Sequence, residues 1–154
     1  MNAAIFLDRD GTMIEDKDYL SNPEHIIFLP GVITALKRFQ DAGYLLVMVS
    51  NQSGIGRGYF TEADYNAVQN RMIEILKNED IFFAGYYYCP HTPYQNCECR
   101  KPCSYMATKA AEDLSINLNE SYMVGDKQSD IIFGKNFGAK GCFNSINALL
   151  EFLQ

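Results

Sequence analysis

Two aspartates separated by one residue stand directly after an apolar run near the start of the chain. Asp8 and Asp10 are followed by Gly11 and Thr12, and a glycine at that place permits a tight turn. Paired carboxylates can supply a nucleophile, a general acid and base, or oxygen ligands for Mg²⁺. Alone, such a pair is also typical of a turn with a helix cap. The rest of the chain must therefore decide between chemistry and a turn.

Further polar residues follow other apolar runs. Ser50 and Asn51 come after the second run, Lys101 lies in the loop after the third, and Asp126 follows the fourth, with Asp130 four residues later. Each of them alone would be an ordinary loop or surface side chain. Their shared position at the ends of apolar runs makes them candidates for a single site.

A second cluster of chemically active side chains lies between these positions. Cys89 and His91 are followed, after five intervening residues, by Cys97 and Cys99. Three thiolates and one imidazole are the ligand number of a closed tetrahedral zinc site. Four protein ligands leave no open position for a catalytic water, so we expect a structural Zn²⁺ in a loop at about 89–103. The loop runs into Lys101, and the metal is therefore expected to rigidify the approach to that lysine.

The elements that must position these residues alternate along the chain. Short, unbroken apolar runs predict strands that are covered on both faces. The strands are expected at Ala3–Leu7, Tyr44–Val49, Phe82–Tyr88, Tyr122–Val124 and Gly141–Phe143. Segments with helical periodicity separate them, at Val32–Ala42, Glu62–Asn78, Ser104–Leu114, Ser129–Phe137 and Ser145–Leu153. Thr61 with Asp64 resembles a capping box at the start of the second helix.

This alternation predicts an α/β fold with a doubly wound, Rossmann-like parallel sheet and right-handed crossovers. The 154 residues suit one domain, 1–154, and no insertion after Asp10 or Gly85 is long enough for a large cap. Such sheets bind ligands beyond the carboxyl ends of their strands. The aspartate pair, Ser50, Lys101 and Asp126 are therefore expected in one crevice.

In this order and placement, the motifs resemble those of the haloacid dehalogenase-like phosphatase superfamily. They are Asp8-Arg9-Asp10-Gly11-Thr12, Ser50, Lys101 and Gly125-Asp126-x-x-x-Asp130. The resemblance implies a Mg²⁺-dependent phosphomonoesterase with Asp8 as nucleophile and Asp10 as general acid and base. It also implies phosphate contacts from Ser50, Asn51 and Lys101.

The same resemblance implies the cofactor sites. Mg²⁺ would be held by Asp8, the backbone carbonyl of Asp10 and Asp126, because Mg²⁺ prefers oxygen ligands. Mg²⁺ and Lys101 would neutralise the repulsion between a phosphate dianion and a carboxylate nucleophile. Asp130 could ligate through water, or hold Lys127 or a loop.

The zinc loop and the sequence Arg100-Lys101-Pro102 resemble one branch of the superfamily. This branch contains D-glycero-D-manno-heptose 1,7-bisphosphate phosphatases and histidinol-phosphate phosphatase domains. Asn51–Gly58 and Tyr122–Lys127 favour the first, whereas the short spacer between His91 and Cys97 is closer to the second. We expect removal of the 7-phosphate from the heptose bisphosphate, with histidinol phosphate as the alternative substrate.

Basic side chains in the loops suit an anionic sugar. Arg57, Arg100 and Lys127 could meet a second phosphate or sugar hydroxyls, and otherwise they would be surface charges paired with nearby acids. Acidic residues near the mouth, Asp16 and Asp18 among them, could instead meet the amine of histidinol phosphate. The sequence leaves both substrates open.

The overall composition limits the partners. The formal net charge is −6, and the 13 Lys and Arg residues form no run. This charge distribution argues against binding to nucleic acid or to an anionic membrane. It therefore also argues against a polynucleotide 3′-phosphatase. No apolar stretch reaches the ~20 residues of a membrane span, so we expect a cytoplasmic monomer acting on a small phosphorylated substrate. Rival functions of another class are a phospho-accepting receiver-like switch and a zinc-stabilised binding module.

Overall fold

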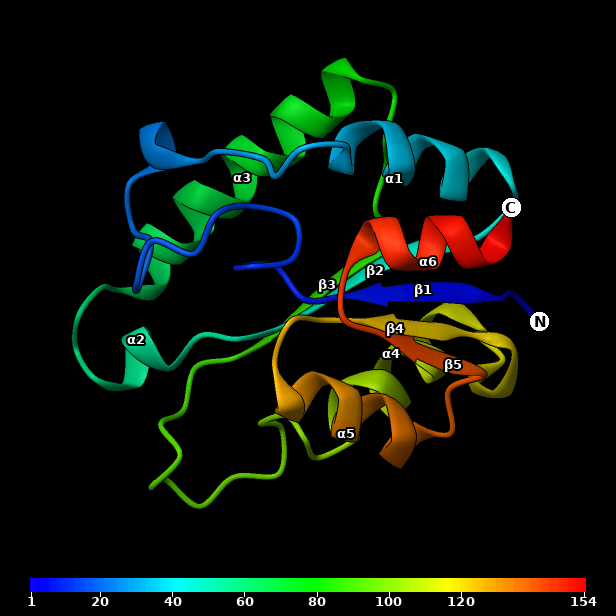
Figure 1. Ribbon diagram of the computed structural model, residues 1–154. Helices are drawn as coiled ribbons and strands as arrows, with labels where there is room; N and C mark the ends of the chain where they lie inside the picture. The colour runs from blue at the N-terminus through cyan, green and yellow to red at the C-terminus, as the bar shows by residue number, and fades with distance from the viewer.

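The computed structural model describes all residues from Met1 to Gln154 and is built around one parallel sheet (Figure 1). Its strands are β1 (Ala4–Leu7), β2 (Leu45–Asn51), β3 (Gly85–Cys89), β4 (Tyr122–Val124) and β5 (Gly141–Phe143). Every neighbouring pair is parallel, and the strands lie in the order β3-β2-β1-β4-β5. The order reverses between β1 and β4, which is where a doubly wound sheet opens a crevice for a ligand. The predicted α/β fold is confirmed.

Helices cover both faces of the sheet. They are α1 (Val32–Asp41), α2 (Ser53–Gly56), α3 (Glu62–Asn78), α4 (Tyr105–Leu114), α5 (Gln128–Phe137) and α6 (Ile146–Leu153), with short 3₁₀ turns at Pro23–His25 and Leu118–Glu120. Figure 1 shows α1, α3 and α6 above the sheet and α4 and α5 below it. The protein is thus a three-layer sandwich.

The strand β1 explains why the sheet is buried on both sides. Ile5 and Leu7 pack into the core shared with α1, α3 and α6, whereas Ala4 and Phe6 pack into the core shared with α4 and α5. Alternate side chains of a strand point to opposite faces, so an unbroken apolar run serves two cores at once. Each large apolar side chain buried in this way contributes roughly 1.5–3 kcal/mol.

The start of α3 carries the predicted capping box. The Thr61 hydroxyl accepts a hydrogen bond from the Asp64 backbone N–H at 3.1 Å, and the Asp64 carboxylate accepts one from the Thr61 N–H at 2.9 Å. The two bonds satisfy donors that a helix start otherwise leaves free. They fix the register of a helix whose inner face supports the site described below.

Several boundaries differ from the sequence prediction. The predicted start of the third strand at Phe82 is wrong, because Phe82 is exposed and pairing with β2 begins only at Gly85. β3 is moreover an edge strand with half-buried tyrosines, not one covered on both faces. The strand β2 runs on to Asn51, and the short helix α2 was not predicted. No helix here has the length and apolar character needed to cross a bilayer.

Candidate active site

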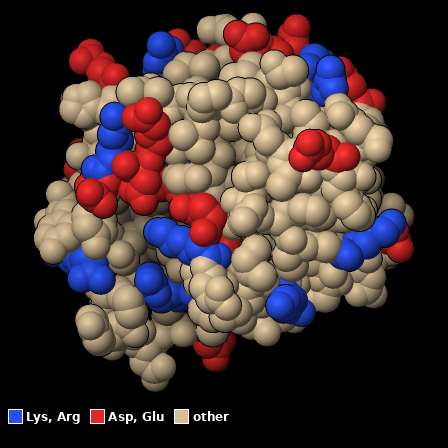
Figure 2. Space-filling view, viewed as in Figure 1, with Lys and Arg blue, Asp and Glu red and all other residues tan.

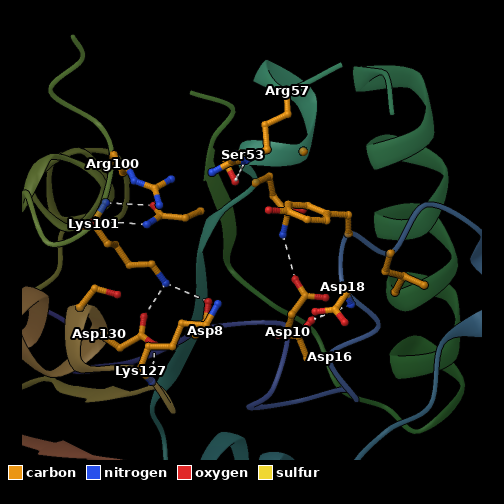
Figure 3. A pocket seen from close by; sticks show the side chains of 16 residues that line it. Asp8, Asp10, Asp16, Asp18, Ser53, Arg57, Arg100, Lys101, Lys127 and Asp130 are labelled. Atoms are coloured by element: carbon orange, nitrogen blue, oxygen red, sulfur yellow. Dashed lines mark hydrogen bonds and ion pairs between the residues drawn. The ribbon is translucent and has the colours of Figure 1, made fainter. Parts of the chain in front are cut away.

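A polar cavity of about 270 Å³ opens at the carboxyl edge of the sheet. Figure 2 shows acidic and basic side chains facing each other across a hollow on this side of the molecule. The close-up in Figure 3 places Arg100 and Lys101 across the cavity from Asp10 and its acidic neighbours. The charged residues of the lining are Asp8, Asp10, Asp16, Asp18, Arg57, Arg100, Lys101, Lys127 and Asp130. Asp8, Asp10 and Lys101 come from distant parts of the chain and meet in this cavity, whereas Ser50 and Asp126, expected in the same crevice, are not among its lining residues.

The floor of the cavity is an ion group made by three of these residues. The Lys101 ammonium donates to Asp8 Oδ1 at 2.8 Å, to Asp130 Oδ1 at 2.6 Å and to the carbonyl of Val49 at 2.8 Å. All three side chains are buried. The other oxygen of Asp130 accepts from the Lys127 backbone N–H at 3.1 Å, so Asp130 ties the lysine to the start of α5.

Burial and neighbouring charges shift the pKa values of Asp8 and Lys101. Burial raises the pKa of Asp8 to about 7, against the lowering effect of the Lys101 charge and with a further rise from the charge of Asp130. Burial lowers the pKa of Lys101, but the carboxylates of Asp8 and Asp130 outweigh it and hold that pKa above its usual value. Lys101 therefore keeps its positive charge near neutral pH, whereas the charge of the Asp8 carboxyl group changes in that range. Such a pair suits a site that accepts an anion with two negative charges.

Three carboxylates form a group that fits a divalent cation. Oxygens of Asp8, Asp126 and Asp130 lie within 4.8 Å of one another. Asp126 lies against the turn after β1, where a Cβ on Gly11 would come within 2.4 Å of its Oδ2 and Thr12 donates to its Oδ1 at 3.4 Å. An all-oxygen donor set suits Mg²⁺. The Asp10 carboxylate is not part of this group. This agrees with the expectation that Asp10 would bind Mg²⁺ through its backbone carbonyl.

The Asp10 side chain is held from behind by residues that the sequence prediction missed. Arg9 and Gln52 both donate to its carboxylate, at 3.1 Å and 2.9 Å. Gln52 also donates to the buried hydroxyl of Ser50 at 2.6 Å. An arginine between two aspartates in a loop shows no burial pattern in the sequence, and only the fold reveals it.

Asn51 does not have the free side chain expected of a phosphate ligand. Its amide donates to the Lys101 carbonyl at 3.2 Å and accepts from the Lys101 N–H at 2.9 Å. This two-point pairing joins the end of β2 to the backbone of the lysine loop. Asn51 lines the cavity, but both of its hydrogen bonds go to the Lys101 backbone, so its side chain positions Lys101.

The basic residues predicted to meet substrate all reach the cavity. Arg57 is held by the Ser53 hydroxyl at 3.4 Å, and its guanidinium carbon lies 6.0 Å from the centre of the Tyr19 ring. Tyr19 has a left-handed backbone with φ of 69° and is a further residue that the sequence did not indicate. Arg100 donates to the carbonyl of His91 at 3.2 Å, whereas Lys127 is exposed.

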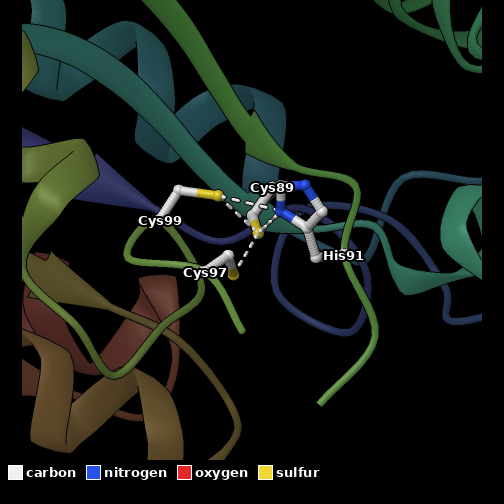
Figure 4. Close-up of side chains that lie close together, drawn as sticks. All are labelled: Cys89, His91, Cys97 and Cys99. Atoms are coloured by element: carbon white, nitrogen blue, oxygen red, sulfur yellow. Dashed lines mark hydrogen bonds between the residues drawn. The ribbon is translucent and has the colours of Figure 1, made fainter. Parts of the chain in front are cut away.

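The four predicted zinc ligands come together in one loop (Figure 4). Cys89 Sγ and Cys97 Sγ are 3.7 Å apart, and His91 Nδ1 lies 3.4 Å from both Cys89 Sγ and Cys99 Sγ. Zinc–sulfur bonds of about 2.3 Å at tetrahedral angles separate two sulfurs by roughly 3.8 Å. The Cys89 to Cys99 distance of 2.7 Å is the one that must lengthen. The residues therefore fit a tetrahedral Zn²⁺, which stays a prediction.

The cysteine loop is bonded to the short helix α2. The N–H of Gly56 donates to the Pro90 carbonyl at 2.9 Å, and the N–H of Gln52 donates to the Cys89 carbonyl at 2.8 Å. A Cβ on Gly56 would lie 2.7 Å from the Pro90 carbonyl oxygen, so glycine permits this close approach. The loop therefore supports the segment that carries Arg57.

The fold and site together define a class. A doubly wound sheet with an aspartate pair after β1, a serine at the end of β2, a buried lysine and an acidic group after β4 is the arrangement of haloacid dehalogenase-like phosphatases. The family described as Polynucleotide kinase 3 phosphatase matches residues 3–147.

Relatives narrow the class. The chain is 44% identical over 144 residues to D-glycero-beta-D-manno-heptose-1,7-bisphosphate 7-phosphatase of Haemophilus ducreyi, covering 89% of this chain and 79% of that protein. It is 41% identical to a probable heptose bisphosphate phosphatase of Thermoplasma volcanium, covering 80% and 84%. The solved D,D-heptose 1.7-bisphosphate phosphatase of B. bronchiseptica, complexed with magnesium and phosphate, superposes with a TM-score of 0.89 at 28% identity, covering 99% and 98%. The chain belongs to this family of phosphoric monoester hydrolases.

Proposed function

We propose that this protein removes the 7-phosphate of D-glycero-D-manno-heptose 1,7-bisphosphate. The observation that carries the proposal is the cavity itself, which sets Asp8 beside Lys101 and brings Arg57, Arg100 and Lys127 to the same space. One phosphate would meet the nucleophile Asp8, and the other would meet the basic side chains of Arg57, Arg100 and Lys127. The names of relatives that are 41–44% identical to this chain support the choice of sugar.

The reaction proceeds in two steps through Asp8. In the first, an Asp8 oxygen attacks phosphorus, the bond from phosphorus to the sugar oxygen breaks, and Asp10 gives that oxygen a proton. In the second, Asp10 takes a proton from water, the water oxygen attacks phosphorus, and the bond to Asp8 breaks. During both steps the positive charge of Lys101 would stabilise the phosphoryl group, and the Ser50 hydroxyl, which accepts from Gln52, would donate to it.

Mg²⁺ would be held by the carboxylates of Asp8 and Asp126 and by the backbone carbonyl of Asp10. When bound, it would neutralise charge on the phosphoryl group and on the nucleophile. Lys101 forms ion pairs with Asp8 and Asp130, and Asp126 forms none, so three clustered carboxylates share one paired ammonium, which supports a second positive charge at this place.

Replacement of Arg57 tests the second phosphate site. Arg57→Ala should raise KM for the bisphosphate about 10–100-fold, because an arginine–phosphate contact is lost, and should leave kcat within about threefold. For a sugar monophosphate, KM should hardly change. Steady-state phosphate release measures both, and Arg71→Ala, which removes an exposed arginine on α3, is the matched control. An equal rise in KM for mono- and bisphosphate would contradict the assignment.

Histidinol phosphate stays the alternative substrate because Asp16 and Asp18 line the cavity and could face its amine. A panel of phosphorylated sugars and histidinol phosphate with Mg²⁺, scored by phosphate release, decides between them. The heptose bisphosphate should have the highest kcat/KM. A higher value for histidinol phosphate would overturn the proposed substrate but not the chemistry.

Zn²⁺ is proposed to be held by Cys89, His91, Cys97 and Cys99 as a structural clip. Cys97→Ser should lower the bound zinc to well below one per chain and reduce the midpoint of thermal unfolding, because metal binding and folding of the loop are coupled. Elemental analysis and thermal melts measure the two effects. Cys103→Ser, which changes an exposed cysteine outside the cluster, is the control. Full zinc content in Cys97→Ser would show that the ligand set is wrong.

A further inference from the structure

The largest side chain that is buried almost completely is a charged one. Arg9, between the two aspartates, is 1% exposed. Arg9 does not line the cavity, and its guanidinium contacts Asp10, which does. Nε donates to Asp10 Oδ2 at 3.1 Å and Nη2 donates to Asp10 Oδ1 at 3.3 Å, so both carboxylate oxygens are held. A fork of this kind fixes the plane of a carboxylate as well as its position.

The guanidinium is in turn fixed by groups that belong to other elements. Nη1 donates at 2.8 Å to Gln69, a buried residue of α3, and Nη2 donates at 3.2 Å to Gln52. The ring of Tyr65, also on α3, faces the guanidinium carbon at 5.4 Å. Arg9 is thus held between α3 and the end of β2.

Gln52 closes the network onto the reaction centre. Its amide nitrogen donates to Asp10 Oδ2 at 2.9 Å and to the Ser50 hydroxyl at 2.6 Å. Asp10 therefore receives three hydrogen bonds from two buried side chains. Its side chain remains partly exposed, at 19%, so a free edge is left for the substrate.

Burial of an arginine is costly unless its donors are paired. The donors of Arg9 are paired with the Asp10 carboxylate and with the side chains of Gln69 and Gln52. Of the two glutamines, only Gln52 lines the cavity. The carboxylate that Arg9 holds lines the cavity, so the same two bonds fix the orientation of a side chain that can meet the substrate. The arrangement suits a carboxyl group that must keep one orientation, and its donors stabilise the carboxylate that remains after Asp10 has given up its proton.

We propose that Arg9 is a positioning residue that holds Asp10 in line with the leaving oxygen, with Gln69 as its anchor. The inference rests on the proposed function. In the first step, as the bond from phosphorus to the leaving oxygen breaks, the proton of Asp10 passes to that oxygen and the electron pair of the broken bond receives it. A misplaced donor leaves an alkoxide without a proton, whereas a p-nitrophenolate needs none.

The test compares two leaving groups in Arg9→Lys, which keeps the charge but cannot span both Asp10 oxygens and Gln69. For the best alkyl phosphate of the substrate panel, kcat/KM should fall about 100-fold, the size of a general-acid contribution. For p-nitrophenyl phosphate it should fall less than about fivefold. The parameter kcat/KM reports the step in which the leaving group departs, so a later step that also uses Asp10 does not blur the comparison.

Gln69→Leu provides a second variant that touches neither substrate nor Asp10. It should show the same selectivity at about tenfold for the alkyl ester. Arg71→Lys, an exposed arginine on the same helix, is the matched control and should change neither rate. Circular dichroism and thermal melts establish that each variant is folded, and if Arg9→Lys is not, Gln69→Leu decides.

Equal losses for both esters, or no loss for either, would overturn the inference. The comparison stays valid if the panel selects histidinol phosphate or another sugar, since each of these has an alkoxide leaving group. Failure of the proposed substrate and failure of this inference are therefore separate results.

Discussion

Asp8→Asn should abolish turnover while leaving the fold intact. An amide oxygen is a poor nucleophile toward phosphorus, and removal of a nucleophile costs on the order of 10⁴-fold or more in kcat. Stability should be unchanged or higher, because burial raises the pKa of Asp8 to about 7 and the ionised form is therefore unfavourable in the folded protein. Phosphate release and urea unfolding measure the two effects.

The wild-type protein supplies a positive control for the same claim. Acid quenching in the first turnover should trap a phosphorylated protein that hydroxylamine cleaves, and Asp8→Asn should trap none. Asp41→Asn, an exposed residue paired with Lys37, is the matched variant. Mass spectrometry must exclude deamidation back to aspartate. Steady-state turnover in a verified Asp8→Asn sample would mean another nucleophile, and a long-lived phosphoprotein without phosphate release would favour the receiver-like switch.

The parts of this site that sequence could predict are those fixed by strand ends. Asp8 and Asp126 follow the buried strands β1 and β4, Lys101 lies in the loop after the edge strand β3, and parallel strands deliver their carboxyl ends to one edge of the sheet. Knowledge of the strands was therefore enough to bring them together. The cysteine loop was predictable for a different reason, since its ligands are close in sequence.

Contacts made through helices could not be predicted in the same way. Arg9 is buried because Gln69 and Tyr65 on α3 receive it, and nothing in the spacing of the chain indicates that pairing. The early start predicted for β3 was wrong for a related reason. Phe82 continues an apolar run, but its N–H donates to the Gln40 side chain at 2.7 Å before pairing with β2 can begin.

Lys101→Met should have the second large effect, on both activity and stability. The ammonium uses all three of its protons inside the protein, two of them on carboxylates. Loss of the cation leaves Asp8 and Asp130 buried and facing each other, and breaking a buried pair costs about 3–5 kcal/mol of unfolding free energy. Activity should fall at least ~10³-fold, because the phosphoryl group loses a fixed positive charge. Urea unfolding and phosphate release measure these changes.

A double variant separates the two roles of the lysine. Asp130→Asn added to Lys101→Met removes one of the facing charges, so about half or more of the lost stability should return. Activity should not return, since the missing charge on the phosphoryl group is not replaced. If the double variant is no more stable than Lys101→Met, repulsion between the carboxylates is not the cause of the loss. If the double variant regains turnover, Lys101 serves only to position Asp8. The claim that the Lys101 charge stabilises the phosphoryl group would then be wrong.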